Sequence, residues 1–487
     1  MESSKQERRV VVEEEEEPVS PTGQYFNSSV LSVCILAALE SDFPIDDTLT
    51  FTLLNNTFLP INPRFSSIMV LSLSLSLSLS KLMLVRDDNG VKRWKKVDVK
   101  LEEHVNVAVF PDGLSPKSYD KYVQDYLSKI AMDRLPQSRP LWEIHLIKYP
   151  TSNAAGTIVF KIHHALGDGF SLMGALFSCL QRADDPSLPL TFPSSRPVSK
   201  SDNHNNIFKI VPQIFSNAFN TVSDFGWSLL KSSLVEDDRT PIRSANDGLE
   251  FRPITISSVA FSLDQIKQIK AKLGGSINDV ITGIIFYGTR LYMKTSSEGS
   301  SNAHTTALVL LNTRIINSYL SVKEMTKPNA ESPWGNQFGF LHVSIPESID
   351  AETGNPLDFV HKARQVIKRK RNSLAVYLTG RLLEMIRKYR GPETTARYMH
   401  STLKNSSMTI SNLIGPMEKM SLADNPIRGL YFMVVGIPQS LTITMVSYMG
   451  MLRVTVGAEK SFINHQMFNS CLEMAFHKIF KAAVCTP

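Results

Sequence analysis

The sequence predicts an α/β protein with two domains of comparable size, and three observations support this. The chain has 487 residues, which is enough for two hydrophobic cores. Its hydrophobic fraction of 43% is typical of a globular protein. Segments with strand and helix periodicity alternate on both sides of a stretch at 184–206, which is rich in Pro, Ser and Asn. No clear internal repeat relates the two halves.

Residues 1–20 are expected to be a disordered tail, because charged residues dominate them and an acidic run fills 13–17. The segment lacks the apolar core of a secretory signal. The four cysteines have no metal-ligand spacing, so we expect reduced thiols facing the cytosol and no metal site.

The first domain is expected at 21–190. Alternating or continuous apolar residues predict strands, and helical spacing predicts helices over 119–132 and 171–182. The strands are expected at 51–54, 105–110, 143–148 and 157–163.

One part of this domain, 71–85, is interpreted as an aberrant insert. Residues 71–80 alternate strictly between Leu and Ser, and a CT dinucleotide repeat encodes that alternation in either frame. The flanks at 68–70 and 86–88 would join naturally as a strand entering a turn. A translated intron or a repeat expansion explains the pattern, and an amphipathic strand is the alternative. Sequencing the mature transcript tests this, because a dominant message containing the repeat would refute mis-annotation.

A linker with an amphipathic segment is expected at 191–250. Small or apolar residues recur near helical spacing over 207–235, which predicts a helix lying on a bilayer or on the protein's own core. Core or inter-domain packing is the preferred interpretation. No stretch of about 20 apolar residues predicts a membrane span.

The second domain is expected at 251–487. Ser262 opens a plausible capping box for a helix ending at Leu273, Gly274 and Gly275 close that helix, and Ser276 caps the next one, at 277–293. Strand-like segments lie at 307–311, 340–345, 442–447 and 452–456.

The stretch from His163 to Gly169, read His-His-Ala-Leu-Gly-Asp-Gly, is the most informative part of the chain. It lies between a buried strand and a helix, a position where loops often present functional groups. Histidine suits proton abstraction because its pKa lies near neutrality. His164 is the better candidate base, while His163 packs or hydrogen-bonds. Two structural histidines are an equally weighted alternative.

Asp168 can cap the following helix, orient an imidazole or form a structural salt bridge, and the salt bridge is favoured because a turn separates it from the histidines. The sequence has no Ser or Cys in a nucleophile-elbow pattern. If His164 is a base, it therefore activates a substrate hydroxyl directly.

Three motifs together carry a family resemblance: HHxxxDG at 163–169, Pro140-Leu141-Trp142, and Asn278-Asp279. With them the chain resembles the wax ester synthase/diacylglycerol acyltransferase family in its plant form, a bifunctional O-acyltransferase branch of the HHxxxDG superfamily. The resemblance covers roughly 19–485 except the Leu-Ser insert. Further matching pieces are Ser20-Pro21, 62–65, 312–314, 335–339 and 411–416.

The resemblance implies two chloramphenicol-acetyltransferase-like domains with the active-site tunnel between them. It implies transfer of a long-chain acyl group from acyl-CoA, as co-substrate, to a long-chain alcohol, or to diacylglycerol as in some members. It makes His164 the general base, supported by His163. Asp168 then keeps the loop in shape and Gly169 leaves room for the thioester. No bound cofactor is expected, and no cofactor-binding residue is assigned.

Candidate substrate-binding residues under this resemblance are Pro140, Leu141, Trp142, Asn278 and Asp279. For Trp142 a packing role is the stronger alternative, and for the Asn-Asp pair helix capping is at least an equal one. Weak candidates for oxyanion donors are Ser411 and Asn412.

The family resemblance also implies a membrane surface as partner, at the cytosolic face of the endoplasmic reticulum or alternatively at the plasma membrane. A basic run at 362–371 is interpreted as a solvated helix face, with CoA phosphates or anionic lipid as alternatives, and nothing else supports nucleic-acid binding. Residues 224–227 read Asp-Phe-Gly-Trp, which is similar to the late DFGWG motif of plant acyltransferases that carry HxxxD early, and this similarity is interpreted as coincidence. Two rival functions remain: an acyltransferase for a soluble specialised metabolite, and a non-catalytic lipid-binding protein on the same fold.

Overall fold

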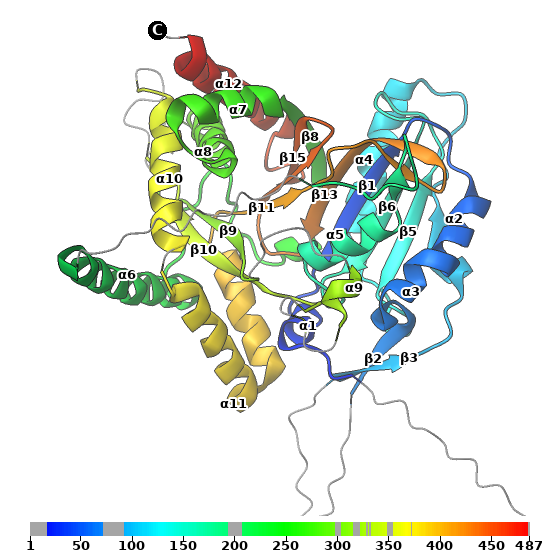
Figure 1. Ribbon diagram of the computed structural model, residues 1–487, viewed down its shortest axis with the longest axis horizontal. Coiled ribbons are helices and arrows are strands. Elements are labelled where there is room, and N and C mark those ends of the chain that lie inside the picture. The colour runs from blue at the N-terminus through cyan, green and yellow to red at the C-terminus, as the bar shows by residue number, and fades with distance from the viewer. Residues whose placement is uncertain are drawn as a thin grey trace, which may run out of the picture.

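Two large β-sheets lie side by side and form the centres of two domains (Figure 1). The computed structural model describes residues 17–485 except 72–91, 193–206, 298–302, 315–321, 328–329, 331–332, 348–353 and 372. The first sheet has seven strands in the order β4-β5-β6-β1-β13-β12-β7. These strands are β1 (Cys34–Ser41), β4 (Val105–Val107), β5 (Trp142–Ile147), β6 (Gly156–His163), β7 (Gln181–Arg182), β12 (Met420–Leu422) and β13 (Asn425–Val435).

The second sheet has six strands in the order β10-β9-β11-β14-β15-β8. They are β8 (Ile254–Ser262), β9 (Thr306–Asn312), β10 (Phe338–Ser344), β11 (Met408–Ile414), β14 (Leu441–Tyr448) and β15 (Met451–Glu459). Most of this sheet is antiparallel, but β11 runs parallel to both of its neighbours.

The chain crosses between the sheets, which the expected boundary at 251 does not account for. Strand β13 comes from the late part of the sequence, yet it pairs antiparallel with β1 in the first sheet. A late segment therefore completes the first domain. The crossing is reinforced by Arg453 of β15, which forms an ion pair with Glu40 of β1 and lies over the Tyr431 ring of β13.

Strands β1 and β6 form the buried centre of the first sheet, and every residue of both is buried. They pair antiparallel with Cys34 opposite His163. The end of β6 therefore lies beside the start of β1, and this register positions the loop that carries the histidines. Strands β5 and β6 confirm the strands expected near 143–148 and 157–163.

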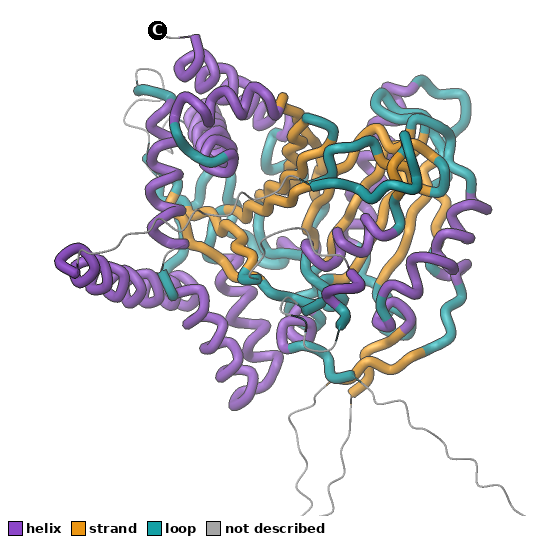
Figure 2. The backbone as a smooth tube through the Cα atoms, viewed as in Figure 1, coloured by secondary structure: helices purple, strands orange, loops and turns teal. Residues whose placement is uncertain are grey.

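Helices cover both faces of the first sheet (Figure 2). They include α2 (Asp47–Leu53), α3 (Leu59–Ile61), α4 (Pro116–Met132) and α5 (Gly169–Ser178), while α1 (Pro21–Phe26) packs against the helical segment 375–404. The strand expected at 51–54 is wrong, because Asp46 caps α2 by accepting a hydrogen bond from the Thr48 backbone and this local signal prevails over the β-propensity of the segment. The helix expected at 171–182 ends early, and its last two residues form β7.

The capping residues expected in the second domain are confirmed. The Ser262 side chain caps α7 (Leu263–Leu273) by accepting from Gln265 N, which is one half of the expected capping box, and Gly274 ends the helix in the left-handed region with φ of 63°. Ser276 caps α8 (Ile277–Ser296) through a reciprocal capping box. The remaining longer helices are α10 (Leu357–Arg371), α11 (Ala375–Lys404) and α12 (His465–Phe480), and a short one is α9 (Val322–Met325).

The amphipathic segment is a helix, α6 (Ile207–Ser233), which lies against α10 and α11. Asp224, within the Asp-Phe-Gly-Trp match, forms an ion pair with Lys370 of α10 at 2.9 Å. This segment therefore contributes to the packing of α6 against α10. Among the described residues no helix has the length and apolarity needed to cross a membrane.

The end of the expected tail is held in place. Backbone hydrogen bonds join Trp94 N to Glu17 O at 2.8 Å and Val19 N to Lys92 O at 2.9 Å, and Val19 is buried. The boundary at residue 20 is thus wrong for 17–20, and 1–16 lie outside the described residues. Of the Leu-Ser segment only Leu71 is described. It ends β2 (Ser67–Leu71), which pairs with β3 (Lys92–Lys96), so the two flanks of the segment form one hairpin.

Candidate active site

The loop from His163 to Asp168 joins β6 to α5 and is tied to its surroundings by backbone hydrogen bonds. His163 N donates to Leu141 O at 3.0 Å, and His164 N donates to Val33 O at 2.8 Å. Strands on both sides of β6 therefore hold the two histidines. The second domain holds the rest of the loop.

The His164 ring is held by Asn336 of the second domain. His164 Nδ1 lies 2.8 Å from Asn336 Oδ1, and Asn336 Nδ2 donates to the His164 carbonyl at 2.9 Å. Because the amide nitrogen is used by the carbonyl, the oxygen faces the ring and can only accept a proton. His164 Nδ1 therefore carries hydrogen, and Nε2 carries the lone pair that a general base requires.

The surroundings of His164 keep it neutral. The side chain is buried, and the rings of Phe26 and Phe338 lie with their centroids 4.9 and 5.4 Å from the imidazole. Burial lowers the pKa of His164, while the charge of Asp168 and the hydrogen bond to Asn336 oppose that shift. A neutral imidazole at physiological pH is the form that can accept a proton.

His163 has a different environment. It is fully buried, its Nδ1 accepts a hydrogen bond from Ala165 N at 3.1 Å, and its Nε2 lies 3.3 Å from Ser32 Oγ. Burial lowers the pKa of His163 to about 3. Both ring nitrogens are engaged within the protein, which suits a supporting role.

Asp168 joins the two domains. One carboxylate oxygen accepts from Ser171 N at 3.0 Å and caps α5, while the other accepts from Arg314 and from Gln337 N. Asp168 and Arg314 are buried, so the pair is shielded from solvent. The favoured salt bridge is present, together with the capping role, whereas the ring of His164 is oriented by Asn336.

A short segment of the second domain, 334–337, lies along the whole loop. Trp334 Nε1 donates to Leu166 O at 2.8 Å, and Gly335 N donates to Ser171 Oγ at 3.2 Å. Arg314 Nη2 also donates to Gly335 O at 2.6 Å. In the sequence, 335–337 and Arg314 were recognised only as family-like pieces and Trp334 was missed, and their partners on the loop and α5 lie 143–172 residues away.

The Pro140-Leu141-Trp142 motif lies behind the loop and packs against it, and its expected role in substrate binding stays a prediction. Trp142 is fully buried, donates from Nε1 to Phe65 O at 2.8 Å, and stacks on His104 with ring centroids 4.1 Å apart. Leu141 provides the carbonyl that accepts from His163 N. Pro140 is also buried. The packing alternative for Trp142 therefore describes its position.

The Asn278-Asp279 motif begins α8. Ser276 N donates to Asp279 Oδ2 at 2.7 Å and Asp279 N donates to Ser276 Oγ at 3.2 Å, so the capping alternative is present, and a contact of Asp279 with substrate stays a prediction. Asn278 is exposed and accepts a 2.6 Å hydrogen bond from the side chain of Asn412, one of the weak oxyanion candidates. This bond links α8 to β11. The other weak candidate, Ser411, is buried in β11.

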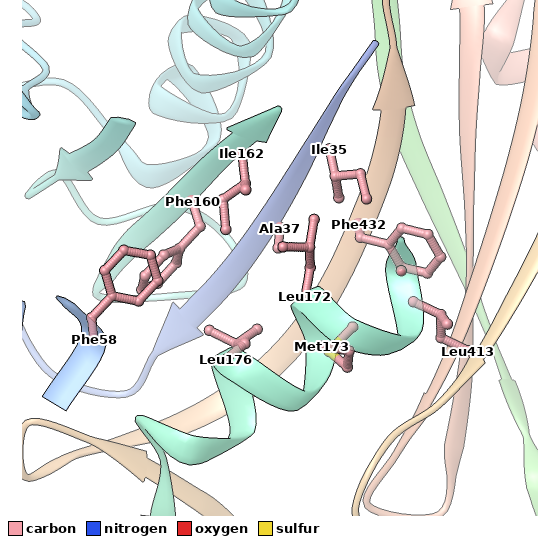
Figure 3. A pocket seen from close by; sticks show the side chains of 11 residues that line it. Ile35, Ala37, Phe58, Phe160, Ile162, Leu172, Met173, Leu176, Leu413 and Phe432 are labelled. Carbon is pink, nitrogen blue, oxygen red and sulfur yellow. The ribbon is translucent and has the colours of Figure 1, made fainter. Parts of the chain in front are cut away.

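A narrow apolar pocket lies between α5 and the first sheet (Figure 3). Phe58, Phe160 and Leu176 lie at one end of it, and Leu413 and Phe432 lie at the other. Gly169 also lines the pocket, and a Cβ built on it would lie 3.4 Å from Leu413, at ordinary van der Waals distance. The remaining lining residues are Ile35, Ala37, Ile162, Leu172 and Met173.

Comparison with protein families matches the two parts of the chain separately. The model described as "Wax ester synthase/diacylglycerol acyltransferase catalytic domain" matches residues 74–281, and the "WS/DGAT C-terminal domain" model matches 334–480. Wax ester synthase/diacylglycerol acyltransferase 11 of Arabidopsis thaliana is 30% identical, over 96% of this chain and 95% of its own length. Member 4 from the same plant is 29% identical, over 92% and 86%.

Solved structures share the fold. The wax ester synthase/diacylglycerol acyltransferase from Marinobacter aquaeolei VT8 has a TM-score of 0.56 and 16% identity, covering 95% of this chain and 98% of that one. A starter condensation domain of rhizomide synthetase has a TM-score of 0.52 and 10% identity, covering 95% and 92%. The expected two-domain fold is confirmed, and the site takes residues from both domains.

The Asp168–Arg314 pair should be a major contributor to stability. We expect Arg314→Met to lower the free energy of unfolding by about 3–5 kcal/mol, because it leaves a buried carboxylate without its cation. The exposed pair Arg381–Glu384 provides a control, since Arg381→Met should cost less than about 1 kcal/mol. Urea denaturation followed by fluorescence measures both. Similar losses in the two variants would contradict the role given to Arg314.

Proposed function

This chain belongs to the wax ester synthase/diacylglycerol acyltransferase family, and from that premise we propose that it transfers a long-chain acyl group from acyl-CoA to a long-chain fatty alcohol, yielding a wax ester. Diacylglycerol is the second acceptor that we propose, yielding triacylglycerol. The observation that carries the proposal is the state of His164, a buried neutral imidazole with its Nδ1 bound to Asn336 and its Nε2 available as a base.

In the proposed reaction the acyl group moves directly from acyl-CoA to the alcohol. Nε2 of His164 removes the hydroxyl proton of the alcohol while the alcohol oxygen attacks the thioester carbonyl carbon. The tetrahedral intermediate collapses with cleavage of the carbon–sulfur bond, and the proton on His164 passes to the departing CoA thiolate. Atoms and charge balance, and His164 returns to its neutral form without an acyl-enzyme intermediate.

The apolar pocket has a free volume of about 20 Å³, so its lining side chains must move apart before a hydrocarbon chain can enter, but their apolar chemistry suits such a chain. Every side chain that lines the pocket is apolar, and Gly169 completes the lining, so it offers no partner for a polar metabolite. Leu413 of β11 and Gly169 of α5 meet at one end of the pocket, directly after the histidine loop. We propose that one substrate chain lies along α5 with its reactive end toward His164. This favours a lipid over a soluble specialised metabolite.

We also propose that the enzyme works on a membrane surface, at the cytosolic face of the endoplasmic reticulum. Both acceptors partition into bilayers, and the neutral base argues against a purely lipid-binding role. Protease treatment of intact microsomes tests the location, because an epitope on this chain should be removed without detergent. Protection of the epitope would contradict a cytosolic orientation.

His164 should control both the rate and its pH dependence. With palmitoyl-CoA and hexadecanol, His164→Ala should lower ester formation about 10²–10⁴-fold. The base must be neutral, and burial lowers its pKa below the ordinary 6.5. Activity should therefore persist as pH falls from 8 to 6.5 and decline only in more acidic buffer. A steady-state pH series checks this. Equal rates for wild type and His164→Ala, or a decline already at pH 7–8, would contradict the assignment.

The far end of the pocket should set chain length. Leu176→Phe adds volume beside Phe58 and Phe160, so the preferred chain should shorten, with discrimination of about 10–200-fold per methylene. Ser178→Phe on the exposed side of α5 is the matched control. Product analysis with mixed acyl-CoAs and mixed alcohols shows which chain is affected. Unchanged profiles for both chains would exclude the pocket as a chain site.

A further inference from the structure

Helix α11 exposes a row of large apolar side chains. Leu374, just before the helix, is 60% exposed, and within it Tyr377 is 54%, Met385 57% and Tyr389 72% exposed. Leu378 is 40% exposed. Successive steps of three, one, seven and four residues place all five within about a third of the helix circumference, together with the exposed Arg381 and Lys388. An exposed apolar face interspersed with basic residues is typical of an interaction surface.

The helix that carries this face projects from the body of the protein. At Gly391 the backbone leaves helical geometry, with φ of 83° and ψ of 170°, and Pro392 follows. The two parts, 375–390 and 392–404, form a hairpin that extends away from both sheets beside α6 (Figures 1 and 2). The exposed residues belong to the first part, which we call the outer helix.

Basic side chains accompany the apolar ones. Arg381, Lys388 and Arg390 of the outer helix are exposed, and Arg387 is half-buried. The acidic residue of this stretch is Glu384, which pairs with Arg381 at 3.3 Å. The net charge is thus positive. Long basic side chains beside tyrosine and apolar residues on one helix are the pattern of a segment lying at the interface of an anionic bilayer.

The inner side of the hairpin reaches the site. Ala396, Met399 and Leu403 belong to one buried cluster with Phe26, and Phe338 packs against that cluster. These two phenylalanines contact the His164 ring. One layer of aromatic side chains therefore lies between the hairpin and the base.

We propose that the outer helix lies in the headgroup region of an anionic bilayer and that the lipid acceptor passes from this bilayer to His164 beside Phe26 and Phe338. The second half of the proposal rests on the proposed function. The positive charge of the face argues for a lipid surface, whereas a second copy of this chain would bring like charges together.

Vesicle flotation of the purified full chain tests the docking. Wild type should float with phosphatidylcholine vesicles containing phosphatidylserine and bind less to phosphatidylcholine alone. The variant Tyr377→Ser/Met385→Ser/Tyr389→Ser should bind at least about tenfold less, because it loses most of the apolar area. The matched control Phe43→Ser/Val109→Ser/Leu188→Ser removes equally exposed side chains elsewhere and should bind like wild type.

Kinetics separate docking from chemistry. The triple serine variant of α11 should esterify hexadecanol in vesicles at least about tenfold more slowly, with an unchanged rate on dissolved hexanol, because the base is untouched. Wild-type flotation and vesicle activity in that variant would overturn the proposal. So would a wild-type dimer that the substitutions dissociate, since the face would then bind a second copy. Wild type that floats but forms no ester would refute the proposed function and leave the docking supported.

Discussion

The site depends on polar links across the boundary between the two domains. Asp168 on the histidine loop binds Arg314, and His164 binds Asn336. Residues of the second domain therefore fix the conformation of the histidine loop in the first domain. Asp168, Arg314 and His164 are buried, so removing the partner of any of them leaves a buried charge or a buried polar atom without its hydrogen-bond partner. The interactions that join the two domains are therefore the same ones that hold the histidine loop in position. The ion pair of Arg453 with Glu40 adds a second link between the same sheets.

The burial of His164 accounts for its lowered pKa, and it also disfavours hydrolysis of the thioester. The phenylalanines around His164 exclude water, which lowers the pKa of the imidazole and keeps it a base. The same exclusion disfavours hydrolysis of the thioester, since water would compete with the alcohol for activation. An apolar pocket on one side and the hairpin of α11, which we propose faces lipid, on the other fit a reaction between two long-chain substrates. The polar side chains of the site are few, and His164 and Asp168 each have a partner in the second domain, Asn336 and Arg314.

Local sequence signals predicted a large part of this structure. The serine caps of α7 and α8, the left-handed glycine after α7 and the buried strand before the histidines are encoded within a few neighbouring residues. The strand expected at 51–54 failed because its β-propensity was overridden by the cap at Asp46. The crossing of β13 into the first sheet was not predicted, because strand pairing over some 390 residues leaves no local pattern.

The site was predicted in part for the same reason. The loop, the preference for His164 and the salt bridge of Asp168 followed from adjacent residues. Arg314 and Asn336 could not be assigned roles, since only the fold brings them to the loop. For Trp142 and Asp279 the alternatives of packing and helix capping are present in their hydrogen bonds, and the substrate contacts that the resemblance implies stay predictions.

The tautomer of His164 tests the central claim most directly. In protein with ¹⁵N-labelled histidine, NMR should show His164 at pH 7 as a neutral ring with hydrogen on Nδ1 and a bare Nε2, assigned by comparison with His164→Gln. Asn336→Ala should abolish that preference, because the acceptor for the Nδ1 hydrogen is removed. A charged ring at pH 7, or a neutral ring with hydrogen on Nε2, would contradict the account of His164 as the base.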